Sequence, residues 1–161
     1  YGKSNTKSDD VVMNFLENIY CDYLVWVNPI APLQKIEDIK KSVNLLINNN
    51  YNTLMTVTEK QVHFLKGNKP INFKLGKKFD RTQDLPSLSE MVYTLMMWNS
   101  KSFIKFYKKN KHAMLHGRTH FYPVNKISSL IVKNKEDLFL IESILEKKNK
   151  LINYDKILKL K

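Results

Sequence analysis

Apolar and polar residues follow two periods along this chain, and the pattern predicts helices and strands in alternation. Apolar side chains recur every three or four residues at 11–19 and again at 36–47, which is typical of amphipathic helices. Ser8 is predicted to cap the first of these helices. Short runs rich in apolar and β-branched residues at 23–27 and 53–58 predict two buried strands.

The order strand, helix, strand suggests where a ligand would bind. Such a crossover unit is expected to pair its two strands in parallel through a right-handed connection. Sheets of this kind hold their ligands at the carboxyl ends of the strands. Asn28 follows the first strand and Thr58 ends the second, so both are predicted to face the ligand crevice.

The rest of the chain does not continue this regular alternation of strand and helix. An insertion at 61–80 is predicted to form a hairpin around the turn at Gly67, followed by a polar loop. Further predicted elements are a buried strand at 91–98, a basic helix from Ser100 or Ser102, a strand pair at 113–116 and 120–124, and a strand at 130–132. Asn134 and Asp137 predict a capped last helix, which leads into a basic tail at 148–161.

The 161 residues fit a single domain, 1–161, that can bury one core. The chain begins with Tyr1 rather than methionine, so we expect it to be a piece of a longer polypeptide. No apolar run reaches the ~20 residues that span a bilayer, and no signal segment opens the chain. Its single cysteine, Cys21, is expected in the core and favours a reducing, cytoplasmic setting.

The formal net charge of +12 favours a polyanionic partner. Arg81 and Arg118 are the only arginines, and scattered lysine mostly keeps a surface solvated. This composition argues against nucleic acid as the main partner, although a basic nucleic-acid-binding module remains one hypothesis. A triphosphate or an acidic sugar would also gain from the positive field.

Two familiar kinds of reactive site are not expected. His112, His116 and His120 are four residues apart, but Gly117 and its flanks favour extended chain, in which neighbouring histidines would lie about 13 Å apart. No zinc site and no other metal ligand is therefore predicted. The four glycines lie far apart and form no phosphate-binding loop. The catalytic residues are unknown from the sequence.

The loop after the hairpin contains Arg81, Gln83 and Asp84. These residues could form an ordinary solvated turn. Arginine is also the side chain best shaped to hold a sugar carboxylate through two parallel hydrogen bonds. The composition leaves both interpretations open.

Four segments in order carry a family resemblance: Asn28 to Leu33, Val57 to Glu59, Arg81 to Pro86, and Glu136 to Leu138. Through them the chain resembles the CMP-N-acylneuraminate synthetase family of sugar cytidylyltransferases, from about residue 8 to about residue 146. The first segment is similar to the Q-P-T-S-P-L of that family, and the third to its R-x-Q-D-L-P.

This resemblance implies an α/β fold: a Rossmann-like nucleotidyltransferase (glycosyltransferase-A-like) domain with a mostly parallel sheet and a small β-hairpin or dimerisation region. It implies a homodimer that joins CTP to an acidic sugar of the sialic-acid type, releases pyrophosphate and uses Mg²⁺. Asn28 would face the sugar, and Arg81 and Gln83 would form the sugar side of the pocket, across the dimer. Thr58 and Tyr93 are the other predicted substrate-binding residues.

The chain also departs from the family pattern. The first strand and the glycine-rich CTP loop would precede Tyr1, so this piece alone is expected to be inactive. The metal-binding D-x-D aligns with Ile131 and Lys133, whose side chains cannot coordinate Mg²⁺, and the Mg²⁺ ligands are therefore not identifiable. A second hypothesis is a degenerate relative that binds a sugar or a partner without catalysis.

Overall fold

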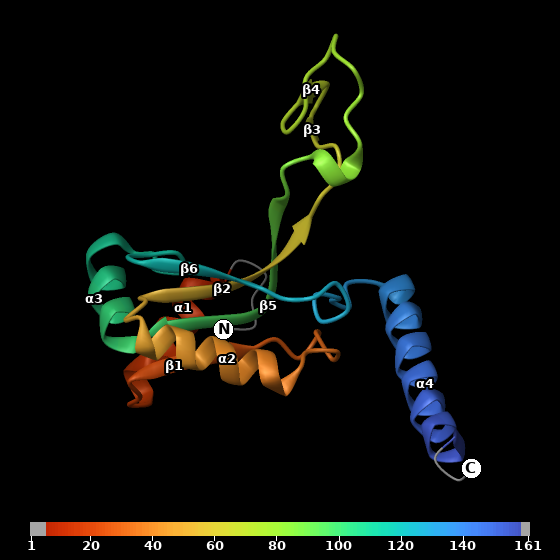
Figure 1. The fold of residues 1–161 in the computed structure, drawn as a ribbon. Helices are drawn as coiled ribbons and strands as arrows, with labels where there is room; N and C mark the ends of the chain where they lie inside the picture. Colours follow the sequence, from red (N-terminus) through yellow and green to blue (C-terminus); the bar gives the residue numbers. More distant parts are fainter. Residues whose placement is uncertain (1–5, 159–161) are drawn as a thin grey trace.

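The computed structural model describes residues 6–158, and side chains as far as Lys147. Its helices are α1 (Ser8–Asn18), α2 (Ile36–Asn48), α3 (Ser100–Asn110) and α4 (Lys135–Leu158), with a short 3-10 helix at Thr82–Asp84. Its strands are β1 (Tyr23–Val27), β2 (Thr53–Lys60), β3 (Leu65–Lys66), β4 (Lys69–Pro70), β5 (Leu88–Asn99) and β6 (Thr119–Pro123) (Figure 1). None of the described helices is long and apolar enough to cross a bilayer.

The main sheet has the strand order β1-β5-β2-β6. β6 runs parallel to β2, whereas β5 runs antiparallel to both of its neighbours, β1 and β2. Three of the four strands therefore point in the same direction, and the predicted α/β fold with a mostly parallel sheet is confirmed in this sense. The expected direct pairing of β1 with β2 is wrong, because β5 lies between them.

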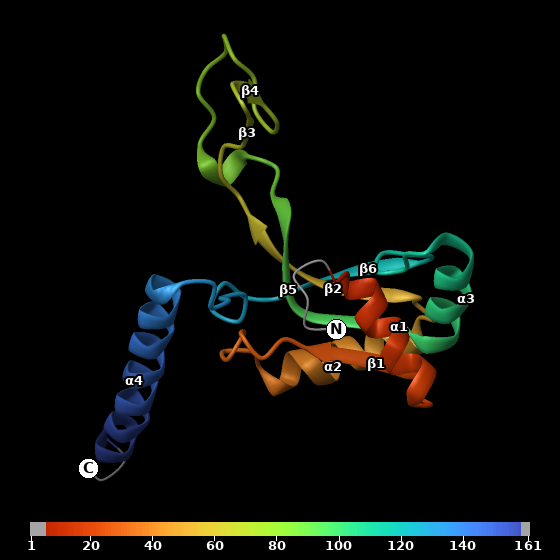
Figure 2. The same cartoon turned by 180° about the vertical axis from the view of Figure 1, so that it is seen from behind.

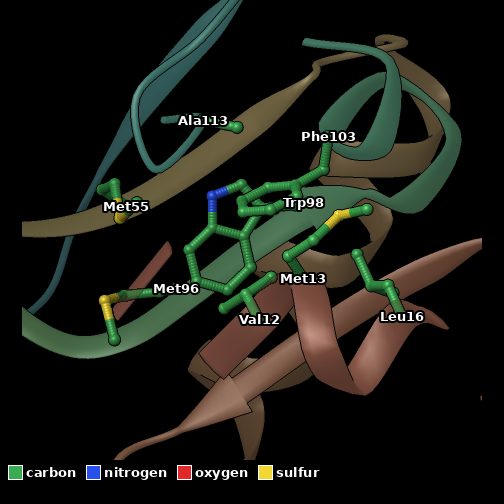
Figure 3. Close-up of a cluster of buried hydrophobic side chains, with 8 residues drawn as sticks. All are labelled: Val12, Met13, Leu16, Met55, Met96, Trp98, Phe103 and Ala113. Atoms are coloured by element: carbon green, nitrogen blue, oxygen red, sulfur yellow. The ribbon is translucent and has the colours of Figure 1, made fainter. Parts of the chain in front are cut away.

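One face of the sheet packs against α1 and α3. Figure 3 shows Trp98 of β5 at the centre of this cluster, next to Val12 and Met13 of α1 and Phe103 of α3. The Trp98 side chain is fully buried, and its Nε1 donates a hydrogen bond to the carbonyl oxygen of Met114 at 2.9 Å. The buried indole therefore keeps a partner for its one polar group.

The opposite face of the sheet packs against α2, where Leu46 meets Leu54, Leu95 and Met97. Successive side chains of a strand point to opposite faces. Because both faces are covered, the centre of β5 is apolar at nearly every position, as the run at 91–98 suggested. Cys21 is half-buried at the edge of the first cluster.

Past the sheet, β2 and β5 continue as a two-stranded ribbon, in which Thr58 lies opposite Glu90 and Lys60 opposite Leu88. The ribbon leads to an arm that carries β3 and β4, and both views show this arm and α4 standing away from the sheet (Figures 1 and 2). The hairpin predicted in the arm is present, but its strands contain two residues each.

Two predicted strands are absent from the described residues. The segment 113–116 forms a loop, and only Thr119–Pro123 of the expected pair is a strand, which pairs with β2 instead. The segment 130–132 forms no strand, although the amide of Val132 donates to the carbonyl oxygen of Ile30 at 2.8 Å.

α3 begins at Ser100, as predicted. Of the two predicted helix caps, one is wrong and one is right. Ser8 is the first helical residue of α1 rather than its cap; Lys7 occupies the cap position without a side-chain hydrogen bond. At α4 the predicted capping box is confirmed: Asn134 Oδ1 accepts from the Asp137 amide at 2.8 Å, and Asp137 Oδ2 accepts from the Asn134 amide at 3.1 Å. The backbone of the predicted basic tail is helical as far as Leu158, and residues 159–161 lie outside the described part.

Candidate functional site

A hollow of about 660 Å³ lies where β2 leaves the sheet and β5 enters it. Residues 58–62 and 90–93 form two of its sides, and six residues between Lys126 and Asp137 form the third. We call it the strand-end hollow. It opens at the carboxyl end of β2, which is the edge at which sheets of this type hold their ligands.

Three of the predicted site residues gather here. Thr58 and Tyr93 line the strand-end hollow, and Asn28 is bonded to the Tyr93 backbone: its Nδ2 donates to the Tyr93 carbonyl oxygen at 3.2 Å. Asn28 Oδ1 accepts from the amide of Ile30 at 3.3 Å. The Asn28 amide therefore holds the turn after β1 and keeps one N–H and one lone pair available for a ligand.

The structure does not bring Arg81 and Gln83 into the strand-end hollow of the same chain. Arg81 forms a bidentate pair with Asp84, through Nε to Oδ2 at 2.7 Å and Nη2 to Oδ1 at 3.2 Å, and 72% of its side chain is exposed. The connection is indirect: Gln61, which lines the hollow, donates from Nε2 to the Gln83 carbonyl oxygen at 2.9 Å.

The lining of the hollow includes several charged groups. Lys60 and Glu90 form an ion pair at 2.5 Å, and Glu59 accepts a hydrogen bond from Ser89 at 2.6 Å. Lys126 and Lys133 also line the hollow, and neither is ion-paired with a described residue. The hollow therefore has cationic groups available for an anionic ligand.

The described residues of the hollow do not fit a Mg²⁺ site. Ile131 and Lys133, which the sequence resemblance places at metal-ligand positions, both line it, and an ammonium group there repels a cation. Asp137 Oδ2 accepts from the Lys133 amide at 2.9 Å and from the Asn134 amide, so this carboxylate serves as a helix cap. Among the described residues no three His, Cys, Asp or Glu side chains come together as metal ligands.

Sequence reasoning missed Lys126 as a site residue and considered Lys133 only as a departure from the metal motif. Both lie on the segment that leads from β6 to α4. That segment meets β2 and β5 only in the folded chain, so no local pattern could place its lysines beside Thr58. The family alignment at Lys133 was the one available signal.

Comparisons with known proteins support the fold. No protein-family model matches the chain, and no curated protein matches its sequence significantly. A solved structure described as 4-diphosphocytidyl-2C-methyl-D-erythritol synthase from Anaerococcus prevotii DSM 20548 is similar, with a TM-score of 0.62 and 12% sequence identity. The match covers 88% of this chain and 65% of that one. The chain therefore has the Rossmann-like α/β fold of this structure.

Proposed function

We propose that this chain is the sugar-binding part of a cytidylyltransferase that joins CTP to an acidic sugar. The observation that carries the proposal is the strand-end hollow, where Thr58, Tyr93 and two lysines line one cavity beside Asn28. The described chain spans about two thirds of the length of its structural neighbour, so the activity is proposed for a larger protein.

The chemistry of the hollow suits a carboxylated sugar. Lys126 and Lys133 can neutralise the carboxylate, and the hydroxyl of Thr58 and the amide of Asn28 can bond sugar hydroxyls. Thr58 is 6% exposed, so a hydrogen bond to it would be shielded from water. A neutral sugar would leave both ammonium groups without an anionic partner.

The transfer step itself is an attack of a sugar hydroxyl on the α-phosphorus of CTP, with release of pyrophosphate. In this chain the proposed roles are binding and orientation of the sugar. A Mg²⁺ ion would neutralise charge on the phosphates if the whole protein binds one, but its ligands would have to come from residues other than those of the strand-end hollow.

The test is calorimetric titration of the chain with N-acetylneuraminate and with its methyl ester, which lacks the negative charge. We expect the acid to bind at least about tenfold more tightly than the ester, and Lys133→Gln to remove most of this preference. Lys40→Gln, which removes an exposed lysine of α2 outside the hollow instead, is the matched control and should leave the preference unchanged. Equal affinities for acid and ester would refute the proposal.

A non-catalytic relative is the second candidate, and Ile131 and Lys133 at the positions of the metal-binding motif favour it. An assay of the whole protein distinguishes the enzyme from the non-catalytic relative. Pyrophosphate release that requires both CTP and an acidic sugar identifies an enzyme. Sugar binding without pyrophosphate release, tested over several acidic sugars, would identify a binding protein.

A further inference from the structure

A second hollow, of about 400 Å³, lies at the opposite end of the sheet, between α3 and the loop that leads into β6. We call it the α3 hollow. α3 contributes Ser102, Lys105 and Lys109 to its wall, and the loop contributes His116 and Gly117. It shares no lining residue with the strand-end hollow.

A half-buried serine and a buried histidine form one wall of the α3 hollow. Ser102 Oγ lies 2.8 Å from Nε2 of His116, and Nδ1 of His116 lies 2.6 Å from the carbonyl oxygen of Ala113. A carbonyl oxygen only accepts hydrogen bonds, so Nδ1 carries the proton and Nε2 is an acceptor, which shares the Ser102 hydroxyl with the Asn99 carbonyl oxygen at 3.1 Å. His116 is 5% exposed, and its ring packs against Phe103 and Phe106. The packing holds the Ser102 oxygen in a defined position.

The α3 hollow is also strongly positive. Lys105 and Lys109 lie one helical turn apart, and neither is ion-paired with a described residue. The stretch from Met91 to Lys135 contains nine lysines and arginines and no Asp or Glu. Asp10 does reach α3, but it accepts a hydrogen bond from Tyr107, which lies on the helix face opposite Lys105. Asp22 and Lys105 line a neighbouring hollow together, but within the described chain neither Lys105 nor Lys109 has a carboxylate as an ion-pair partner.

We propose that the α3 hollow binds the phosphate group of a small phosphorylated molecule. Two ammonium groups one turn apart match the two charges of a phosphate monoester, whereas a single one would satisfy a carboxylate. The volume lies near the lower end of the range for small-molecule sites, which admits a phosphate with a short organic group.

The serine–histidine pair couples phosphate binding to proton uptake. Burial lowers the pKa of His116, so the imidazole of the empty site is neutral at neutral pH. A bound dianion favours the imidazolium, which donates from Nε2 to Ser102 and frees the Ser102 hydroxyl to donate to a phosphate oxygen. The polar and titratable groups around this ring are Lys105, Lys109 and Ser102 of α3, His112 beyond Phe106, and Thr53 of β2. The dianion is therefore expected to bind more tightly as the pH falls from 8 to about 6.5; closer to pH 6 the phosphate itself takes up a proton and loses one of its two charges.

The experiment is a titration of the whole chain with phenyl phosphate, followed by calorimetry and by NMR of the His116 ring. We expect saturable binding that moves the His116 signals toward the imidazolium position. The double variant Lys105→Gln, Lys109→Gln should raise the dissociation constant about tenfold or more. The double variant Lys77→Gln, Lys78→Gln removes two lysines of the arm and should bind as the wild type does.

Three results would overturn the proposal. The first is equal affinity of phenyl phosphate for the wild type and for the Lys105 and Lys109 double variant. The second is that benzoate, a monoanion, binds as tightly as phenyl phosphate, because the site would then not select a dianion. The third is that single-stranded RNA binds more tightly than phenyl phosphate, and that its binding depends on Lys108 and Lys111 as much as on Lys105. This result would indicate an extended nucleic-acid surface.

Discussion

Gly117 turns the chain into β6 with a φ of +60°, a conformation that side chains with a Cβ rarely adopt. An added Cβ would also overlap the side chain of Asn52, whose Oδ1 accepts from the Arg118 amide at 2.8 Å. Gly67 has the same φ, but nothing lies within 4 Å of its added Cβ. We predict that Gly117→Ala lowers the free energy of unfolding by about 2–3 kcal/mol and Gly67→Ala by about 1 kcal/mol, measured by urea unfolding. Equal losses would show that Asn52 moves aside without cost.

His116 makes the stability of the fold depend on pH. Burial lowers its pKa below the ordinary value of 6.5, so at and below that pH the unfolded chain binds more protons than the folded chain. The contribution of neutral His116 to stability is therefore complete above about pH 7.5 and is lost as the pH falls through 6.5 toward the folded pKa. His116→Gln removes this titration.

The measurement is urea unfolding of the wild type and of His116→Gln between pH 5 and pH 8. We expect the stability advantage of the wild type to be largest at pH 8 and to shrink toward pH 5. His112→Gln, at an exposed position, should follow the wild type across this range. An advantage that stays constant with pH would mean that His116 does not change its charge on unfolding.

At the scale of elements, one hydrogen bond joins α1 to α3. Tyr107 donates to Asp10, and this bond, together with burial, raises the pKa of Tyr107 to about 12. The contribution is fully present below about pH 10, where tyrosine ionises in the unfolded chain, and is lost as the pH rises toward 12. We predict that Tyr107→Phe costs about 1–2 kcal/mol of unfolding free energy at pH 7, because Asp10 loses its partner.

The check is urea unfolding beside Tyr20→Phe, since Tyr20 is 93% exposed and its hydroxyl should contribute little. Ultraviolet titration of the folded protein should show one tyrosine fewer ionising near pH 12 in Tyr107→Phe. If both variants lose the same unfolding free energy, the hydrogen bond between Tyr107 and Asp10 does not stabilise the fold more than an exposed hydroxyl does.

The capping box of α4 gives a second prediction at this scale. Asn134→Ala leaves the Asp137 amide without its acceptor and should cost about 1 kcal/mol locally. We expect faster amide hydrogen exchange in the first turn of α4, with the sheet unaffected. Glu142→Ala changes an exposed position within the same helix and should leave this exchange rate unchanged. Uniformly faster exchange across the chain would contradict a local role.

Elements with a local sequence signal were predictable, and those fixed by distant contacts were not. The capping box and the apolar stripe of α2 can be read within a few residues. The segment 113–116 looked like a strand, yet Asp9 of α1 accepts from the amides of Ala113 and Met114. A carboxylate about a hundred residues earlier thus satisfies the backbone that a strand partner was expected to satisfy.

At the scale of the whole molecule, the order of the strands in the sheet decides which candidate site residues come together, and the sequence does not show this order directly. Asn28, Thr58 and Tyr93 come together because β5 brings Tyr93 between the ends of β1 and β2. The same β5 follows an arm, whose length and direction no periodicity encodes. Arg81 on that arm therefore lies outside the strand-end hollow of its own chain, and its predicted place across a dimer stays a prediction.

The arm explains how Arg81 could still serve a sugar site. Its large apolar side chains are exposed, with Leu75 at 70% and Phe79 at 74%, and exposed apolar patches of this kind often mark interfaces. In a two-fold dimer, each arm would present Arg81 to the strand-end hollow of the other subunit. The exposed pair with Asp84 contributes little stability, so Arg81 can exchange this partner for a sugar carboxylate at small cost.

Mixed dimers separate this arrangement from one in which Arg81 acts within its own chain. We predict that Arg81→Ala and Lys133→Gln each weaken the binding of N-acetylneuraminate about tenfold or more, so that neither variant alone has tight sites. When equal amounts of the two variants are refolded together, half of the dimers combine one of each, and one of their two sites has both an intact hollow and an intact arm. Calorimetry should then recover about one quarter of the wild-type sites. An arginine that acts within its own chain would give no recovery, because neither variant holds both residues, and sedimentation equilibrium that shows only monomers would exclude the shared site.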